Sequence, residues 1–169
     1  TLRLASGSYS MNSTDSRATQ VLLSDPSPPG GTYVALGFAN PDYATASPNP
    51  AFIPEGQLAA DVIITGTSTA SGNVSTQVTP SAIGVNGTPS TVTVYTARIS
   101  FSQTTRRIGA GQFRDDIYVH IPTHNNAGIA ATFTSPDTSV VAVTPSAGIP
   151  AGSYYTYFTT QAKSPGTAV

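Results

Sequence analysis

The chain has 169 residues, only 9% of which are charged, and its formal net charge is −1. So weak a charge excludes the basic surface that nucleic acids or anionic membranes need, and no apolar run approaches the roughly 20 residues of a transmembrane helix. Cysteine is absent, which excludes disulfides and thiolate metal sites. We therefore expect neither a nucleic-acid partner nor insertion into a membrane.

Short segments of alternating apolar and polar residues, separated by turns rich in Pro, Gly and Asn, run through the first 95 residues. In chain order, this pattern predicts strands at residues 2–4, 21–23, 33–38, 58–64, 74–78 and 91–95. Four apolar side chains share one face of the fourth strand: Leu58, Ala60, Val62 and Ile64. Val92 and Val94 share a face of the last one. Because no segment has a helical period, the pattern indicates an antiparallel β-sandwich.

The second part of the chain repeats the first. Residues 38–42 (FANPD) return 95 residues later as 133–137 (FTSPD), and residues 53–56 (IPEG) return after 96 residues as 149–152 (IPAG). Identities that keep register over such a distance indicate duplicated modules. We therefore expect two modules, at residues 1–95 and 96–169, the second with strands near residues 99–101, 117–121, 129–133 and 153–160.

These residues resemble a known kind of module. A strand that ends in Ser-Pro-Asp (135–137), a short Val-Ala-Val strand (141–143), Pro145 and an Ile-Pro-x-Gly turn (149–152) are followed by a long alternating strand. This order resembles the bacterial Ig-like repeat modules that occur in tandem in large extracellular and cell-surface proteins. The resemblance implies an all-β fold of two tandem Ig-like antiparallel β-sandwiches, and it carries no catalytic signature.

The second module is expected to be incomplete. Position 169 corresponds to position 74 of the first module, before its last two strands. Either the repeat array continues beyond residue 169, or a neighbouring chain supplies the missing strands by strand complementation. Both explanations stay open at this point.

No catalytic, cofactor-binding or metal site is expected, and we predict that the protein is not an enzyme. The only histidines, His120 and His124, are separated by Pro122, and His120 lies in the predicted strand 117–121, so they do not share a helix face. Further metal ligands would have to come from Asp115 and Asp116. No strand–turn–helix elbow exposes a serine nucleophile.

The two aspartates of the repeated turn, Asp42 and Asp137, each follow a proline. A calcium site would need about six to eight oxygen ligands with several converging carboxylates, and the whole chain has eight acidic residues. We expect these two side chains to bond the local backbone instead.

Candidate partner contacts lie in the second module. Alternation along residues 153–160 directs Tyr154 and Phe158 inward and Tyr155 and Tyr157 outward, where paired tyrosines could pack across the sheet or contact a partner. The only basic cluster is at Arg106 and Arg107, either as a solvated loop or in a salt bridge between modules or chains. The candidate contact residues are Tyr155, Tyr157, Arg106 and Arg107.

Together these features predict a non-catalytic structural repeat or spacer of an extracellular or cell-surface bacterial protein or filament. Its partners would be neighbouring copies of itself or adjacent repeats, and the short linker at residues 95–96 would make a stiff rod. One alternative is an adhesin module that binds carbohydrate or a surface receptor. Another is a decoration or tail protein of a phage or virus.

Overall fold

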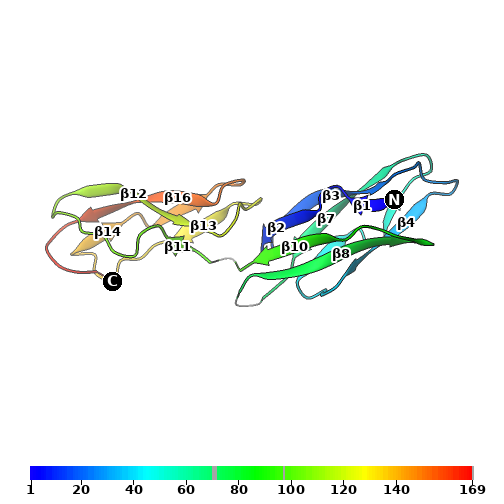
Figure 1. Ribbon diagram of the computed structural model, residues 1–169. Helices are drawn as coiled ribbons and strands as arrows, with labels where there is room; N and C mark the ends of the chain where they lie inside the picture. Colours follow the sequence, from blue (N-terminus) through cyan, green and yellow to red (C-terminus); the bar gives the residue numbers. More distant parts are fainter. Residues whose placement is uncertain (70–71, 97, 169) are drawn as a thin grey trace. The chain divides into compact units, whose positions relative to one another are not determined.

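The computed structural model describes residues 1–169 except residues 70, 71, 97 and 169. Every regular element in the described residues is a β-strand, so the predicted all-β class is confirmed. The chain divides into two compact units, Thr1–Thr96 and Ala97–Val169 (Figure 1). In the described part of the chain there is no helix that could cross a membrane.

The first sheet of unit 1 is antiparallel throughout. In spatial order it contains β1 (Leu2–Leu4), β3 (Ser16–Leu23), β7 (Ala59–Gly66) and β5 (Ala44–Ser47). The centre of the sheet is the long pair of β3 and β7, which runs from Ser16 opposite Thr65 to Leu22 opposite Ala59.

The second sheet of unit 1 contains, in spatial order, β2 (Ser8–Asn12), β10 (Ser90–Tyr95), β8 (Val74–Ala82), β4 (Thr32–Phe38) and β6 (Ala51–Ile53), and β9 (Val85–Asn86) pairs with β8. One pair departs from the predicted antiparallel arrangement, because β2 runs parallel to β10. Residues 5–7 carry the chain from β1 to the other sheet, where β2 pairs with β10 at the edge.

Apolar side chains from the two sheets fill the interior of unit 1. Val62 and Ile64 of β7 are buried with Val92 and Val94 of β10, as the alternation predicts. Leu58 is an exception: it is exposed, because it precedes the first residue of β7 and the alternation does not extend to it.

Unit 2 has one four-stranded sheet and one hairpin. The sheet contains β11 (Ser100–Phe101), β12 (Phe113–His120), β16 (Tyr155–Ala162) and β14 (Val141–Val143), and the hairpin pairs β13 (Ile129–Thr132) with β15 (Ser146–Ile149). Four buried residues form the core between them: Ile117, Val119, Ala131 and Phe158.

The two units share a strand order. The sheet β1-β3-β7-β5 returns as β11-β12-β16-β14, and β7 and β16 have equal lengths and begin 96 residues apart. The β13–β15 hairpin corresponds to β4 and β6. Among the described residues of unit 2, no strand takes the place of β2, β8 or β10. The second unit thus has a complete first sheet and only part of the second.

Candidate interaction surface

Tyr155 and Tyr157 lie on the outer face of β16, as predicted, and Phe158 between the sheets is buried. Tyr154 was predicted to point inward, and this prediction is wrong because its side chain is exposed. Since β16 begins only at Tyr155, the residue before it follows the geometry of the preceding turn and not the alternation of the strand.

A third tyrosine, Tyr118, lies beside Tyr155 and Tyr157, and it was not among the predicted contact residues. Tyr118 of β12 lies directly opposite Tyr157 of β16, and its ring centroid lies 5.5 Å from that of Tyr157 and 5.6 Å from that of Tyr155. Ile117 and Val119, which flank Tyr118, are both buried. The alternation of the predicted strand 117–121 therefore contained the signal for an outward Tyr118, but only the pairing of β12 with β16 places it beside the other tyrosines.

Both histidines adjoin these rings. His120 lies opposite Tyr155 in the ladder, its ring 6.0 Å from that of Tyr118, and His124 lies 5.2 Å from Tyr154. Tyr118, Tyr155 and Tyr157 meet one another at interplanar angles of 65°, 73° and 89°, the edge-to-face geometry that aromatic pairs favour. We call this group the tyrosine surface; its members are Tyr118, His120, His124, Tyr154, Tyr155 and Tyr157.

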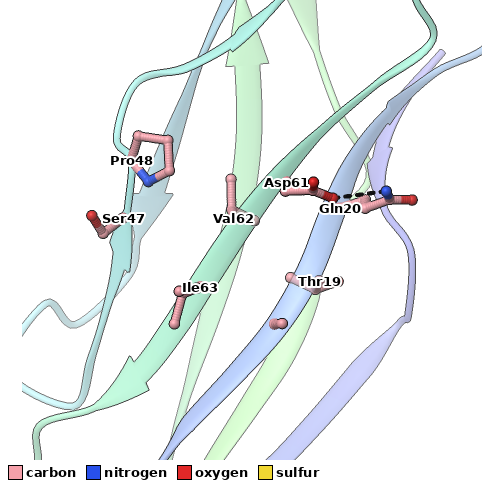
Figure 2. A pocket seen from close by; sticks show the side chains of 8 residues that line it. Thr19, Gln20, Ser47, Pro48, Asp61, Val62 and Ile63 are labelled. Atoms are coloured by element: carbon pink, nitrogen blue, oxygen red, sulfur yellow. Dashed lines mark hydrogen bonds between the residues drawn. The ribbon is translucent and has the colours of Figure 1, made fainter.

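The corresponding place in unit 1 is occupied by polar residues. Asp61 stands in β7 where Tyr157 stands in β16, and opposite it Gln20 Nε2 donates a hydrogen bond of 2.8 Å to Asp61 Oδ1 (Figure 2). The corresponding sheets of the two units thus hold a Gln20–Asp61 pair in unit 1 and a Tyr118–Tyr157 pair in unit 2. The arrangement of strands therefore does not require tyrosines at these positions.

An open groove surrounds the Gln20–Asp61 pair. Figure 2 shows that Ser47, Pro48 and Ile63 contribute to its lining together with the two strands β3 and β7. Asp61 is the only titratable side chain in the described lining, and its carboxylate accepts the hydrogen bond from Gln20. General acid–base chemistry with a second titratable group therefore has no partner among these lining residues.

The basic cluster is divided between two roles. Arg106 forms an ion pair of 2.6 Å with Asp116 and donates a hydrogen bond of 2.9 Å to Gln103 Oε1. All three residues belong to unit 2, and a salt bridge of Arg106 to another module or chain stays a prediction. Its partner Asp116 lies in β12, two residues before Tyr118, and Arg107 beside it is exposed.

The two turn aspartates behave differently. Asp137 caps its turn as predicted: its Oδ1 accepts hydrogen bonds from the Ser139 hydroxyl at 2.6 Å and the Ser139 amide at 2.9 Å. These bonds and a weaker one from the Val140 amide lower the pKa of Asp137. In unit 1 the prediction for Asp42 is wrong, because there the side chain of Asn40 accepts a hydrogen bond from the amide of Asp42. Within the described residues, no three His, Asp or Glu side chains converge on a metal position.

Comparisons with known proteins give no family. No family model and no curated protein matches the chain. Among solved structures, domains 5–6 of the S-layer protein SbsC align with 96% of this chain and 83% of their own length, at 14% identity and a TM-score of 0.44. A chaperone–tip adhesin complex of CFA/I fimbriae biogenesis aligns with 96% and 83% (12% identity, TM-score 0.46), and the CupB2 chaperone of Pseudomonas aeruginosa with 92% and 87% (8%, 0.42). At these identities and TM-scores the likeness assigns no function.

Proposed function

We propose that the chain is a non-catalytic, load-bearing segment of an extracellular or cell-surface protein or filament, built from tandem Ig-like β-sandwich modules. The observation that carries this proposal is the parallel pair of β2 and β10 in unit 1. It joins a strand near the beginning of the unit to the last strand over five residue pairs, from Ser8 opposite Thr91 to Asn12 opposite Tyr95.

The direction of this pair decides how it responds to tension. Force that enters unit 1 at its N-terminus and leaves after Tyr95 pulls β2 and β10 in opposite directions along their own axes. All hydrogen bonds between the two strands are then loaded together in shear, whereas an antiparallel hairpin pulled from its open end would lose them one at a time. A unit with this load path resists extension, which suits a spacer under mechanical load.

Further support comes from the repeated strand order and from the chemistry of the outer faces. Hydroxyl pairs join neighbouring strands, with Ser75 and Thr93 at 3.0 Å and Ser16 and Thr65 at 2.9 Å. Such pairs stabilise a sheet without charge, so salt does not screen them. Structural units that repeat in tandem behave as a one-dimensional array in which each contributes its own stability.

Single-molecule force spectroscopy of the full chain, held at its two ends, tests this proposal. Unit 1 has 96 residues, so we expect one discrete unfolding event that lengthens the chain by about 30 nm.

The backbone amide of Tyr9 faces β10. Thr91 N–H donates to Gly7 O and Ser13 N–H donates to Tyr95 O, and because backbone groups alternate along a strand, the amide of Tyr9 is directed toward β10 as well.

Two variants at Tyr9 isolate the β2–β10 pair. Tyr9→Pro removes the side chain and the amide hydrogen, whereas Tyr9→Ala removes the side chain alone. We expect the unfolding force to fall further in Tyr9→Pro than in Tyr9→Ala. Equal forces in the two variants, or a gradual extension without a discrete event, would contradict the load-bearing function.

A second candidate function rests on the tyrosine surface. Tyr155 and Tyr157 replace Ala59 and Asp61 of unit 1 on a sheet that does not need them, and exposed tyrosines are well suited to contact sugars or a protein receptor. This proposal predicts that the chain binds members of a glycan array, and that Tyr155→Ala with Tyr157→Asp, the residues of unit 1, abolishes the binding while the fold is kept. Unchanged signals in that variant would exclude the tyrosine surface as the binding site.

A further inference from the structure

The hairpin strand β13 has one edge without a strand. In the described residues β13 pairs only with β15, from Ile129 opposite Ile149 to Thr132 opposite Ser146. Just after β13, the amide of Phe133 donates to the carbonyl of Pro145 at 2.9 Å. Because alternate residues of a strand direct their backbone groups to opposite edges, those of Ala130, Thr132 and Thr134 face away from β15.

Unit 1 shows what occupies this edge in the complete sandwich. There β4, which corresponds to β13, pairs on that side with β8, from Ala35 opposite Ser81 to Phe38 opposite Val78. The amide of Ala39 donates to the carbonyl of Gln77 at 2.8 Å, and the residue 95 positions after Ala39 is Thr134. The backbone groups that bind β8 in unit 1 therefore have counterparts in unit 2 that face no strand among the described residues.

Apolar side chains next to this edge are also uncovered. Phe101 is 54% exposed, although its ring centroid lies 6.5 Å from that of Phe133 and 5.9 Å from that of the buried Phe158. Ile99 is also 47% exposed, whereas Leu2 and Leu4, which take the places of Ile99 and Phe101 in unit 1, are 0% and 2% exposed. In unit 1 the corresponding strand β1 is covered by β8 and the residues that follow it: β1 contacts β8, and the carbonyl of Leu2 accepts a hydrogen bond from the amide of Thr88.

We propose that the free edge of β13, together with Phe101 and Phe133, is a strand-acceptor site that binds an antiparallel strand of the β8 kind from a neighbouring repeat. This inference deepens the proposed tandem-module function and rests on it. The chemistry of the occupant is that of β8: an uncharged strand whose alternate side chains, Thr76, Val78 and Pro80, are small enough to be buried over the core. A second copy of this chain is not the donor, because its own β8 is already paired with β4 and β10.

Hydrogen exchange of the full 169-residue chain, read by NMR, tests the site with a synthetic peptide of residues 74–95. This peptide contains β8 and β10 and so supplies the inward Val78, Val92 and Val94. At saturation we expect the exchange of the Thr132 amide to slow at least about tenfold, the effect of a hydrogen bond worth about 1.4 kcal/mol. The same peptide with Val78→Asp and Val92→Asp should leave Thr132 unchanged.

A pair of protein variants locates the binding. Thr132→Pro removes the amide hydrogen at the free edge while leaving the ladder to β15 intact, and Thr132→Ala keeps the hydrogen. We expect Thr132→Pro to weaken peptide binding at least about tenfold relative to Thr132→Ala. If Thr132→Pro unfolds unit 2, Phe101→Ser makes the same test, since it changes an exposed ring, and it should also weaken binding.

Three results would overturn the inference. The first is that the peptide of residues 74–95 shows no saturable binding. The second is that it binds the two Thr132 variants equally, or binds Phe101→Ser and the unchanged chain equally. The third is that the chain alone forms a dimer in which the Thr132 amide is already protected from exchange. The force measurement reports on the β2–β10 pair of unit 1, so failure of the strand-acceptor site and failure of the load-bearing function can be told apart.

Discussion

Two neighbouring isoleucines of β7 provide a direct test of the sandwich interior. Ile64 is 0% exposed and belongs to the core of unit 1, whereas Ile63 on the opposite face of the same strand is 48% exposed. Substituting each by alanine removes the same atoms from the same strand. The change in intrinsic strand preference is therefore matched, and the difference between the two variants measures burial.

The expected magnitudes follow from these exposures. Replacing a buried isoleucine by alanine costs about 2–5 kcal/mol, because transfer free energy is lost and a cavity remains. At Ile63 roughly half of the side chain already contacts water, so we expect a loss of about 1 kcal/mol or less. For a unit of this size, 1 kcal/mol corresponds to about 4–8 °C in Tm, so Ile64→Ala should unfold at least about 4 °C below Ile63→Ala.

Thermal and urea unfolding of the full chain, followed through the NMR amide signals of β3 and β7, measures this difference in unit 1 alone. Signals of β12 and β16 serve as an internal control and should keep their own midpoint in both variants. If the two variants differed by less than about 0.5 kcal/mol, Ile64 would not lie in a packed interior and the two-sheet arrangement of unit 1 would be refuted.

Three further predictions concern the units, a turn and an ion pair. Residues 1–96 alone should unfold cooperatively in urea, followed by circular dichroism, and residues 97–169 alone should unfold at a lower urea concentration, because the packed core cluster of their described residues has four buried members against fourteen in unit 1; an equal or higher midpoint of the second fragment would contradict this. The hydrogen bonds that lower the pKa of Asp137 stabilise the turn above the ordinary carboxyl pKa, and this stabilisation is lost as the pH falls through the lowered value. NMR titration should therefore place Asp137 below an ordinary aspartate, and Ser139→Ala should raise its midpoint; an unchanged midpoint would show that these bonds do not form in solution. Arg106→Ala should lower the free energy of unfolding of unit 2, measured by urea denaturation, by less than about 1 kcal/mol, because both partners of its ion pair are partly exposed. A larger loss would contradict the description of this pair as a surface ion pair.

Most strands could be predicted because their signal is local. The alternation of apolar and polar residues placed strands close to β4, β7, β10 and β16, and correctly assigned Val92 and Val94 to one buried face. The errors at Leu58 and Tyr154 lie just outside strand ends. Alternation has meaning only while the backbone stays extended, and the sequence marks the end of that conformation less clearly than its middle.

Partner choice, in contrast, depends on residues far apart in the chain. Nothing near Tyr118 indicates that it will lie opposite Tyr157, and nothing near Arg106 indicates Asp116 as its partner, because a strand's neighbour depends on the path of the whole chain. The same holds for the parallel pairing of β2 with β10.

The alternation of apolar and polar residues was enough to predict an all-β chain, and the 95-residue repeat predicted two similar modules, because both signals lie in the order of the residues. Which strands pair, in which direction, and which edge stays open were decided by tertiary packing. Hydrogen bonds between strands and the burial of apolar faces exist only once distant segments meet. The comparison of β4, which is paired along both edges, with β13, which is paired along one edge among the described residues, illustrates this.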